Sequence, residues 1–435
     1  MSRVLVTGGA GFIGSHVVDA LRREGHEPVV YDRRPSPWHD RSALETVLGD
    51  LTDVDRLTDA MDGCEAVCHL AAAADVDQVA DAPLDAEQVN ARGTVCVLEA
   101  ARRAGVQRVV YASTIWVYSD VEAAVVDEDT ALQPPAHLYT ATKLSGELYC
   151  RSYRELYGVE SVVLRFGIPY GPRARPAAVV PAFVARARTG EPMTIAGDGA
   201  QTRRFVYVED LADGVVRGLA PAAANRTYNL VGARDVSIRE VAETVRDVLG
   251  GAEITHRPGR SGDFRGAEVS GERARRELGW TASTEFAEGV RRYIAWLDAV
   301  EAAPPVRAHL PDALPALRRA LLPAVLVGLL VAVVAAAGSI DEVADEVPLG
   351  MLTMLIGLPV ALVTRLERGS ALARRVGSGL LVLAVALLAA VLLPVPGGGA
   401  LHAHWAATLL LAGSLTVAGA YSGAAGLPEP RLSRG

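Results

Sequence analysis

Apolar and polar positions alternate in blocks along the first 300 residues of the chain. Short apolar runs bounded by polar residues are typical of buried strands, and they occur at residues 3–7, 29–33, 65–73 and 108–114. Between them, residues 14–24 and 90–105 carry apolar side chains at helical spacing. Strands that alternate with helices of this length predict an α/β fold, with a doubly wound parallel sheet of the Rossmann type.

Helical spacing returns further along the chain, at residues 239–250, 273–280 and 286–300. We interpret these segments as packing elements of a small α/β subdomain that binds substrate. The sequence therefore predicts a Rossmann core over residues 1–165 and a second subdomain over residues 166–300, interleaved with that core.

A different pattern follows a proline-rich linker at residues 301–319. Four apolar runs without internal charge each have about the length that a helix needs to cross a bilayer core. They are Leu321–Gly338, Val347–Val363, Val376–Pro394 and Ala403–Tyr421. The alternative is the buried helical bundle of a water-soluble domain, but the helices of such a bundle need a polar face toward water, and these runs have scarcely one. We expect an all-α transmembrane region of four helices over residues 320–422 and a cytoplasmic tail over 423–435.

The arginines that flank these runs predict the orientation of the region. Arg318 and Arg319 precede the first run, and the second connection carries further arginines, whereas the first and third connections have none. Positive residues collect on the cytoplasmic side, so we expect a multi-pass protein of the inner (cytoplasmic) membrane with its first 300 residues in the cytoplasm. No Asp, Glu, Lys or Arg lies inside the runs, so they indicate an anchor in the lipid bilayer rather than a transport pathway.

Composition adds two exclusions to this picture. With 43 basic and 51 acidic residues, the formal net charge of −8 gives no reason to expect a nucleic-acid partner. The chain has four cysteines, which lack paired CxxC spacing and are expected to be small buried side chains. No metal site is therefore predicted.

The first strand runs directly into the glycine-rich segment VTGGAGFIGSH at residues 6–16. Gly8 and Gly11 would let the backbone turn tightly and approach a pyrophosphate at the N-terminus of the next helix. Gly14 would let that helix pack closely on the strand. A strand before the loop and a helix after it are the context that a dinucleotide-binding site requires.

An acidic residue ends the second strand, about twenty residues after the loop. Asp32 would accept hydrogen bonds from the adenosine ribose hydroxyls, and its charge would repel a 2′-phosphate. This favours NAD over NADP, but Arg33 and Arg34 could accommodate the phosphate and leave NADP open. An ordinary acidic turn residue is the alternative for Asp32.

Several motifs in register resemble the extended short-chain dehydrogenase/reductase family, the group of nucleotide-sugar epimerases and dehydratases. The resemblance covers roughly residues 1–298. It rests on the glycine spacing and on GDLTD at 49–53, HLAAAADV at 69–76, NARGT at 90–94, YASTIWVYSD at 111–120 and YTATK at 139–143. The resemblance implies NAD as cofactor, held by Gly8, Gly11, Phe12, Ile13, Gly14, Asp32, Asp50, Leu51, Leu70, Ala71, Ala72, Asn90, Tyr139 and Lys143. Family members often form a homodimer through a helix bundle.

The last two motifs carry the predicted catalytic residues. Tyr139 and Lys143 lie four residues apart, so on a helix they share one face. A phenol is too weak a base at neutral pH, but a neighbouring ammonium and an oxidised nicotinamide would both favour the phenolate. The resemblance implies that Thr114 bridges a sugar hydroxyl and Tyr139 while a proton and a hydride leave the sugar. For the Tyr–Lys pair alone, two surface residues four apart by chance are the alternative.

The two positions after Thr114 predict which reaction follows. Family members that eliminate water or decarboxylate carry an acidic residue there, whereas this chain has Ile115 and Trp116. The resemblance then implies 4-epimerisation of a nucleotide sugar of the UDP-glucose/UDP-galactose type, through a transient 4-keto intermediate. Another NAD(P)-dependent nucleotide-sugar enzyme (a UDP-uronate epimerase, a dehydratase or a reductase) remains open, as does a non-catalytic NAD-binding membrane scaffold.

Arginines in the second subdomain are the candidate contacts for the substrate diphosphate. Arg203 lies in GDGAQTRRFVYVEDLADGV at 197–215, which closely matches a family segment, and Arg265 is a second candidate. A diphosphate needs fixed guanidinium partners, although surface salt bridges are the alternative for both residues. With Thr114, they form the predicted substrate-binding set. Ile168 stands where the family often has Asn, which leaves the sugar open. A membrane glycosyltransferase is a further candidate partner.

Overall fold

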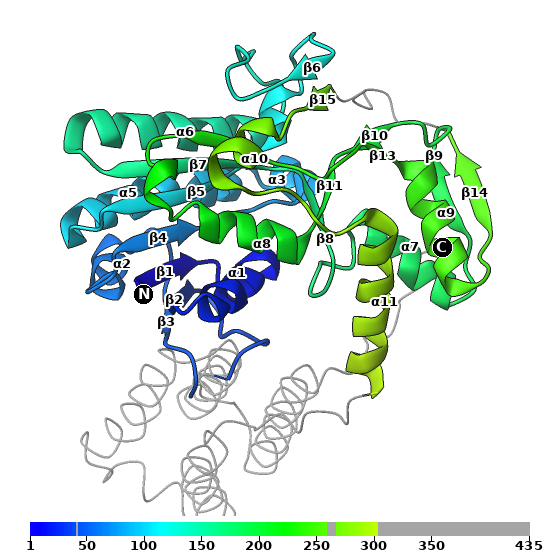
Figure 1. Cartoon of the computed structure of the whole chain (residues 1–435), viewed down its shortest axis with the longest axis horizontal. Helices are drawn as coiled ribbons and strands as arrows, with labels where there is room; N and C mark the ends of the chain where they lie inside the picture. Colours follow the sequence, from blue (N-terminus) through cyan, green and yellow to red (C-terminus); the bar gives the residue numbers. More distant parts are fainter. Residues whose placement is uncertain (41, 259–266, 303–435) are drawn as a thin grey trace, which may run out of the picture. The chain divides into compact units, whose positions relative to one another are not determined.

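A computed structural model describes residues 1–40, 42–258 and 267–302, and the structural statements below concern these residues. At the centre is a parallel sheet of seven strands in the order β12-β7-β5-β4-β1-β2-β3 (Figure 1). Its strands are β1 Arg3–Thr7, β2 Glu27–Asp32, β3 Thr46–Leu48, β4 Ala66–His69, β5 Arg108–Thr114, β7 Glu160–Phe166 and β12 Thr227–Leu230. The doubly wound parallel sheet that the apolar pattern predicted is confirmed.

Helices cover both faces of the sheet, because successive strand side chains point to opposite sides. Leu5 packs into one core, whereas Val4 and Val6 pack into the other. The first core contains side chains of α2 Val54–Ala60, α5 Gly93–Ala104 and α6 Leu138–Tyr157. The second contains side chains of α1 Phe12–Arg23, α8 Val208–Arg217 and α10 Glu272–Leu278.

A smaller cluster of elements lies beside the sheet (Figure 1). Its core joins α7 Val179–Arg188, α9 Ile238–Leu249 and α11 Phe286–Ala302. Parallel strand pairs support these helices, namely β8 Ile168–Tyr170 with β11 Phe205–Tyr207 and β9 Met193–Ala196 with β14 Ile254–Arg257. The antiparallel pair β10 Thr202–Arg203 and β13 Val236–Ser237 completes it.

Several short elements complete the described fold. They are α3 Val76–Asp81, α4 Pro83–Glu87, a π-helical turn Gln88–Arg92, 3₁₀ turns Ile115–Tyr118 and Pro221–Ala223, and the pair β6 Val125–Val126 with β15 Glu268–Val269. The chain enters the smaller cluster after β7 and returns to pair β12 with β7 at the sheet edge. Residues from both parts therefore lie near the carboxyl ends of the central strands.

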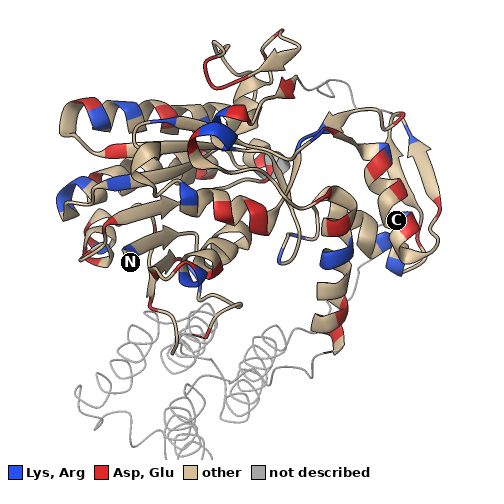
Figure 2. Cartoon of the chain, in the orientation of Figure 1, with Lys and Arg blue, Asp and Glu red and all other residues tan. Residues whose placement is uncertain are grey.

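Acidic and basic residues are interspersed along the helices (Figure 2). On α5, Glu99 pairs with Arg102 and Arg103 one turn further on. On α11, Glu288 pairs in the same way with Arg291 and Arg292. Such pairs each stabilise a helix by about 0.2–0.5 kcal/mol.

Several predictions from the sequence concern residues outside the described part. The linker at 301–319, the four apolar runs within 320–422, the tail at 423–435 and Arg265 all lie there, except that α11 extends to Ala302. Within the residues that the structure does describe, no helix combines the length and the apolar character needed to span a bilayer.

Candidate active site

The loop between β1 and α1 forms a cradle that has no room for side chains. Gly8 has a φ of +71°, and a Cβ on it would lie 2.8 Å from the backbone of Ala71. A Cβ on Gly14 would lie 2.1 Å from the Gly8 carbonyl oxygen, so only glycine lets α1 approach the loop this closely. The first N–H groups of α1, at Phe12 and Ile13, have no acceptor within the helix. This cradle fits the pyrophosphate of a dinucleotide.

Asp32 lies beside the cradle, at the end of β2. Its Oδ2 accepts a hydrogen bond of 3.2 Å from the N–H of Ala10, and its Oδ1 accepts one of 3.1 Å from the N–H of Arg34. These bonds fix the carboxylate next to the glycine loop. A carboxylate oxygen can accept more than one bond, so Asp32 keeps acceptor capacity for ribose hydroxyls.

The segment after β3 is also held against the sheet. The hydroxyl of Tyr31 donates to the Asp50 carbonyl at 2.8 Å, and the backbone and side chain of Thr52 donate to Asp50 Oδ1 at 3.0 and 2.7 Å. The Thr52 N–H is the main reason that the pKa of Asp50 is lowered. Leu51 packs on the adjacent α5, where a Cβ on Gly93 would lie 3.0 Å from its Cδ1.

The loop after β4 carries Leu70, Ala71 and Ala72, and two polar residues hold it. Leu70 N–H donates to the Thr7 carbonyl at 3.2 Å, and Ala71 N–H donates to Thr7 Oγ1 at 3.3 Å. Asn90 is buried; its Oδ1 accepts from Ala73 N–H at 2.8 Å, and its Nδ2 donates to the Ala73 carbonyl at 3.0 Å. Asn90 thus positions this loop, and a direct contact between Asn90 and the cofactor stays a prediction.

Thr114 and Tyr139 are brought together from β5 and the first turn of α6. Thr114 is buried, and its Oγ1 accepts the N–H of Trp116 at 3.2 Å, so the hydroxyl proton remains free to be donated. Burial raises the pKa of Tyr139 to about 12, against the opposing effects of a hydrogen bond with Thr114 and the charge of Arg175. A further positive charge near Tyr139 is therefore needed to form the phenolate at neutral pH.

Lys143 lies one helical turn after Tyr139 and is buried. Its Nζ is 5.0 Å from the centroid of the Tyr111 ring. Burial lowers the pKa of Lys143 to about 8, whereas Cys150 and Glu147 act in the opposite direction. Lys143 is also the only lysine in the 435-residue chain, a compositional signal that our reading of the sequence missed. An amine can exchange a proton in this pH range, whereas a guanidinium cannot.

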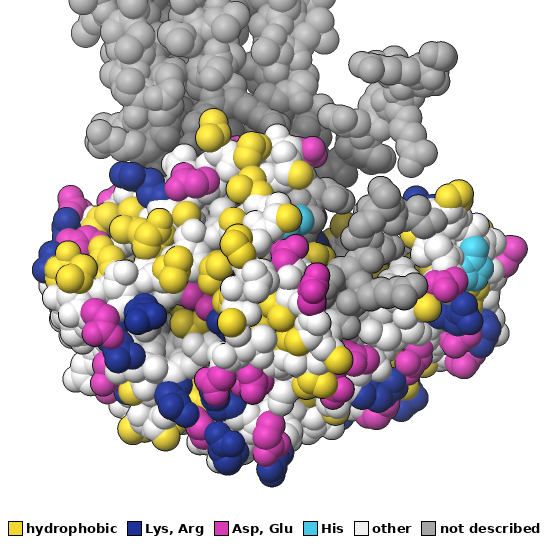
Figure 3. Space-filling model, turned by 90° about the horizontal axis from the view of Figure 1, so that it is seen from above, with side chains coloured by type: hydrophobic (Ala, Val, Ile, Leu, Met, Phe, Trp, Pro, Cys, Tyr) yellow, Lys and Arg dark blue, Asp and Glu magenta, His cyan; other side chains and the backbone are white. Residues whose placement is uncertain are grey.

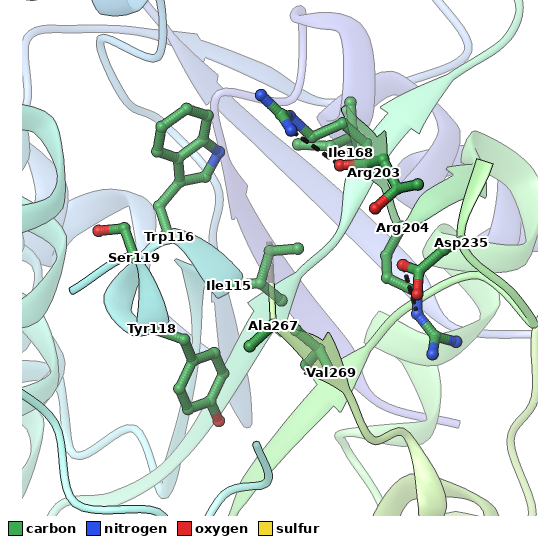
Figure 4. A pocket seen from close by; sticks show the side chains of 11 residues that line it. Ile115, Trp116, Tyr118, Ser119, Ile168, Arg203, Arg204, Asp235, Ala267 and Val269 are labelled. Carbon is green, nitrogen blue, oxygen red and sulfur yellow. Dashed lines mark hydrogen bonds and ion pairs between the residues drawn. The ribbon is translucent and has the colours of Figure 1, made fainter. Parts of the chain in front are cut away.

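A pocket opens between the turn after Thr114 and the smaller cluster (Figure 4). Its lining residues are Ile115, Trp116, Tyr118, Ser119, Ile168, Thr202, Arg203, Arg204, Asp235, Ala267 and Val269. Arg203, the predicted phosphate contact, lies in this wall and donates to the Thr202 carbonyl at 2.7 Å. The charge of its neighbour Arg204 is compensated, because its Nε is 3.0 Å from Asp235 Oδ1 and its Nη2 is 3.0 Å from Glu268 Oε1.

The pocket contains functional candidates that the sequence reading did not assign. Ile115, Trp116 and Ile168 were noted only for the polar groups they lack, yet all three side chains form the pocket wall. Their closeness to Thr114 along the chain could have indicated this for Ile115 and Trp116. No such signal existed for Asp235, which meets Arg204 through the pairing of β10 with β13.

Comparison with known proteins gives a consistent picture. The sequence profile described as "NAD dependent epimerase/dehydratase family" matches residues 4–231. The UDP-glucose 4-epimerase of Mycolicibacterium smegmatis is 37% identical over 307 residues, which cover 67% of this chain and 97% of that protein. The crystal structure of UDP-glucose 4-epimerase from Thermotoga maritima with UDP-glucose is similar, with a TM-score of 0.65 at 29% identity over 69% of this chain and 99% of that one. MoeE5 in complex with UDP-glucose and NAD has a TM-score of 0.63 at 33% identity over 69% of this chain and 100% of that one.

Proposed function

The chain belongs to the NAD dependent epimerase/dehydratase family, and from that membership we propose that it catalyses the 4-epimerisation of a nucleotide sugar. It is an NAD-dependent enzyme of the epimerase kind, and its substrate is a nucleotide sugar. Within this class, we assign it a UDP-hexose of the UDP-glucose/UDP-galactose type. The reaction would pass through a transient 4-keto sugar.

The arrangement of Thr114, Tyr139 and Lys143 supports this chemistry. The phenolate oxygen of Tyr139 takes the proton from the sugar O4 and becomes a hydroxyl, while the Thr114 hydroxyl hydrogen-bonds the same sugar oxygen and holds it against Tyr139. The ammonium of Lys143 favours the phenolate form of Tyr139. When the ketone is reduced again, Tyr139 returns the proton. Epimerisation at C4 does not require a second acid or base beside the neighbouring carbons of the sugar.

The fit of the cofactor rests on the glycine cradle and on Asp32. Gly8 and Gly14 allow a close approach of the loop, α1 and the Ala71 backbone that any Cβ would prevent, and Asp32 presents its carboxylate beside this loop. When bound, NAD supplies the hydride acceptor and the positive charge that the raised pKa of Tyr139 calls for. We also assign to the cofactor six residues in segments that hydrogen bonds hold in place, namely Asp50, Leu51, Leu70, Ala71, Ala72 and Asn90.

The observation that carries epimerisation over dehydration is the absence of a free acid in the described pocket wall. Ile115 and Trp116 follow Thr114, and neither can protonate a leaving hydroxyl. Asp235 is the carboxylate of that wall, and its charge is taken up by Arg204 at 3.0 Å. An elimination would need an acid next to C5 and C6 of the sugar. Arg203, together with Arg265 from outside the described residues, is assigned to the diphosphate.

We further propose that the enzyme is a homodimer anchored to the inner membrane. Apolar side chains gather on the face over α6 (Figure 3), where Leu148, Leu156 and Tyr157 are exposed. A second copy covering this face would remove them from water. The uncharged runs after residue 320 support anchoring in the lipid bilayer, with the active site on the cytoplasmic face. Such a position suits a membrane glycosyltransferase that consumes the product.

The reaction is tested by incubating the purified full chain with UDP-glucose, UDP-galactose and their N-acetyl and uronate forms, and identifying products by NMR. We expect interconversion at C4 with C5 and C6 intact. Tyr139→Phe keeps the ring but removes the proton carrier, so turnover should fall by about 10²–10⁴-fold. Tyr157→Phe, at the exposed end of the same helix, is the matched control and should retain full turnover. Full activity of Tyr139→Phe, or a 4-keto-6-deoxy product, would contradict the proposal.

A further inference from the structure

A buried carboxylate lies one helical turn beyond Lys143. Glu147 Oε1 accepts hydrogen bonds from Ser113 Oγ at 2.5 Å and from Arg165 Nε at 3.0 Å, and its Oε2 accepts from Arg165 Nη2 at 2.7 Å. The Glu147 and Arg165 side chains are only 10% and 6% exposed. Ser113 directly precedes Thr114 on β5, so one carboxylate joins the strand that carries Thr114 to the helix that carries Tyr139 and Lys143.

The same arginine extends the connection to the pocket. Arg165 Nη1 donates to the Tyr118 hydroxyl at 2.7 Å, and that hydroxyl donates to Asn229 Oδ1 at 3.0 Å. The guanidinium also stacks over the Tyr118 ring, 5.0 Å from its centroid. Tyr118 ends the 3₁₀ turn that begins beside Thr114 and contains Trp116.

We propose that Glu147 is a positioning residue of the active site, which fixes Thr114 against α6 and keeps a carboxylate within one turn of the Lys143 amine. This inference rests on the proposed roles of Thr114, Tyr139 and Lys143. It assigns a function to a side chain that touches none of the reacting atoms. The bidentate contact with Arg165 satisfies the carboxylate in a place where an unpaired charge would be costly.

The charges around Lys143 give the expected direction of the effect. Titratable and aromatic groups face it from several elements: Glu147 and Cys150 on α6, His69 on β4, and Tyr111 on β5. Burial pulls the pKa of the amine down to about 8, and Glu147 acts against that burial. Without the negative charge of Glu147, the ammonium would lose its proton at a lower pH. The phenolate of Tyr139 would then lose its cationic neighbour within the working pH range.

A single lysine makes this measurable without cofactor or turnover. Competitive labelling of amines in the NAD-free full chain, read by mass spectrometry, gives the pH at which Lys143 becomes reactive, with the exposed Met1 amine as internal reference. We call the pH at which half of the Lys143 amine is reactive the Lys143 midpoint. Glu147→Gln should move this midpoint to lower pH by on the order of one unit. The alkaline limb of kcat/KM should move in the same direction. Ser113→Ala keeps every charge, so it should lower kcat without moving the midpoint.

The matched control is an ion pair of the same kind away from the site. Arg226 Nη2 contacts Glu277 Oε1 at 2.8 Å and Oε2 at 3.0 Å, so Glu277→Gln removes a similar bidentate bond and should change neither the midpoint nor kcat/KM. If Glu147→Gln does not fold because Arg165 is left unpaired, Glu147→Gln combined with Arg165→Met removes both charges and should still lower the midpoint.

Two outcomes separate this inference from the proposed function. A folded Glu147→Gln protein with the wild-type Lys143 midpoint and the wild-type pH profile would make Glu147 a mere structural contact and overturn the inference. If the wild-type protein turns over no nucleotide sugar, the proposed function fails instead, while the labelling result still decides whether Glu147 acts on Lys143.

Discussion

Lys143 is the one position at which this chain has an amine in its side chain. A guanidinium stays charged at every pH that a folded protein survives, and its broad fork needs several acceptors. An amine is compact, and burial lowers the pKa of Lys143 to about 8, so its charge can respond to groups nearby. The residue that tunes a phenol therefore has to be lysine, although arginine meets every other requirement for a positive side chain in the chain.

Two buried histidines make a prediction about acid stability. His69 bonds to Thr7 Oγ1 at 2.8 Å and to Thr94 Oγ1 at 3.0 Å, and His16 Nε2 bonds to the Pro172 carbonyl at 2.9 Å. Burial lowers the pKa of His69 to about 3 and that of His16 to about 4. Imidazoles in the unfolded chain titrate near pH 6.5, so below that pH the unfolded chain binds protons that the folded chain does not bind. The free energy of unfolding should therefore fall as the pH drops from about 6.5 towards 4.

Urea unfolding at several pH values measures this slope. Each histidine should contribute up to about 1.4 kcal/mol per pH unit within that window. His69→Gln should flatten the slope, whereas His256→Gln, at an exposed position, should leave it unchanged. An identical slope in His69→Gln and in the wild type would show that the acid sensitivity has another source.

At the scale of single residues, the sequence predicted what is local. The glycines of the cradle and the Tyr–Lys pair lie within a few positions of one another, and short spacing along the chain translates directly into a loop or a helix face. Glu147 and Arg165 could not be paired in this way. They lie on α6 and β7, and only the packing of that helix on the sheet brings them together.

At the scale of elements, the close approach of α6 to β5 shapes the site. Tyr111 is fully buried, and its hydroxyl donates to the Lys143 carbonyl at 3.1 Å. Gly146 makes room for that ring, because a Cβ there would lie 2.1 Å from the Tyr111 hydroxyl oxygen. The position of Lys143 relative to the strand therefore depends on a missing side chain in the next turn of the helix.

Gly146→Ala should both destabilise the protein and slow it. The new methyl group has no space, so α6 must move away from β5, at a cost of about 1–3 kcal/mol in the free energy of unfolding. Gly93→Ala is the control in α5, since its Cβ would meet the side chain of Leu51 at 3.0 Å and would lie at an ordinary contact distance of 3.5 Å from the Gln88 carbonyl oxygen. Alanine also favours a helix over glycine by about 1 kcal/mol. Denaturant unfolding and kcat are measured for both variants. A Gly146→Ala protein as stable as the wild type would show that α6 does not need this close approach to β5.

The apolar pattern predicted the long elements better than the short ones. β5 lies at the predicted residues 108–114, and α9, α10 and α11 lie within two residues of their predicted segments. The π-helical turn Gln88–Arg92 and the strand pairs of two to four residues in the smaller cluster were not predicted. Such strands contain too few positions for a periodicity, and partners far away in the sequence determine them.

At the scale of the whole molecule, the chain joins an enzyme to a segment of another composition. Residues Met1–Pro304 form one compact unit. The Mycolicibacterium smegmatis relative matches over 307 residues that cover 97% of its own length and 67% of this chain, so that protein has no counterpart to about a third of this chain. The parallel sheet and the enzyme class were predictable because they depend on the first part. The membrane region rests on hydropathy and on flanking arginines, and stays a proposal.

The anchor can be tested by separating the two parts. The full chain should sediment with membranes and resist extraction by high salt and alkali, because four uncharged runs of bilayer length would leave the lipid only with detergent. A truncated chain ending at Pro304 should be released into the supernatant and keep its kcat, since the compact unit contains the cradle, Thr114, Tyr139 and Lys143. A reporter active only in the cytoplasm, fused after Gly435, should be active, as the arginine distribution requires. Release of the full chain by salt alone would contradict the anchor, and an inactive reporter would contradict the orientation but not the anchor.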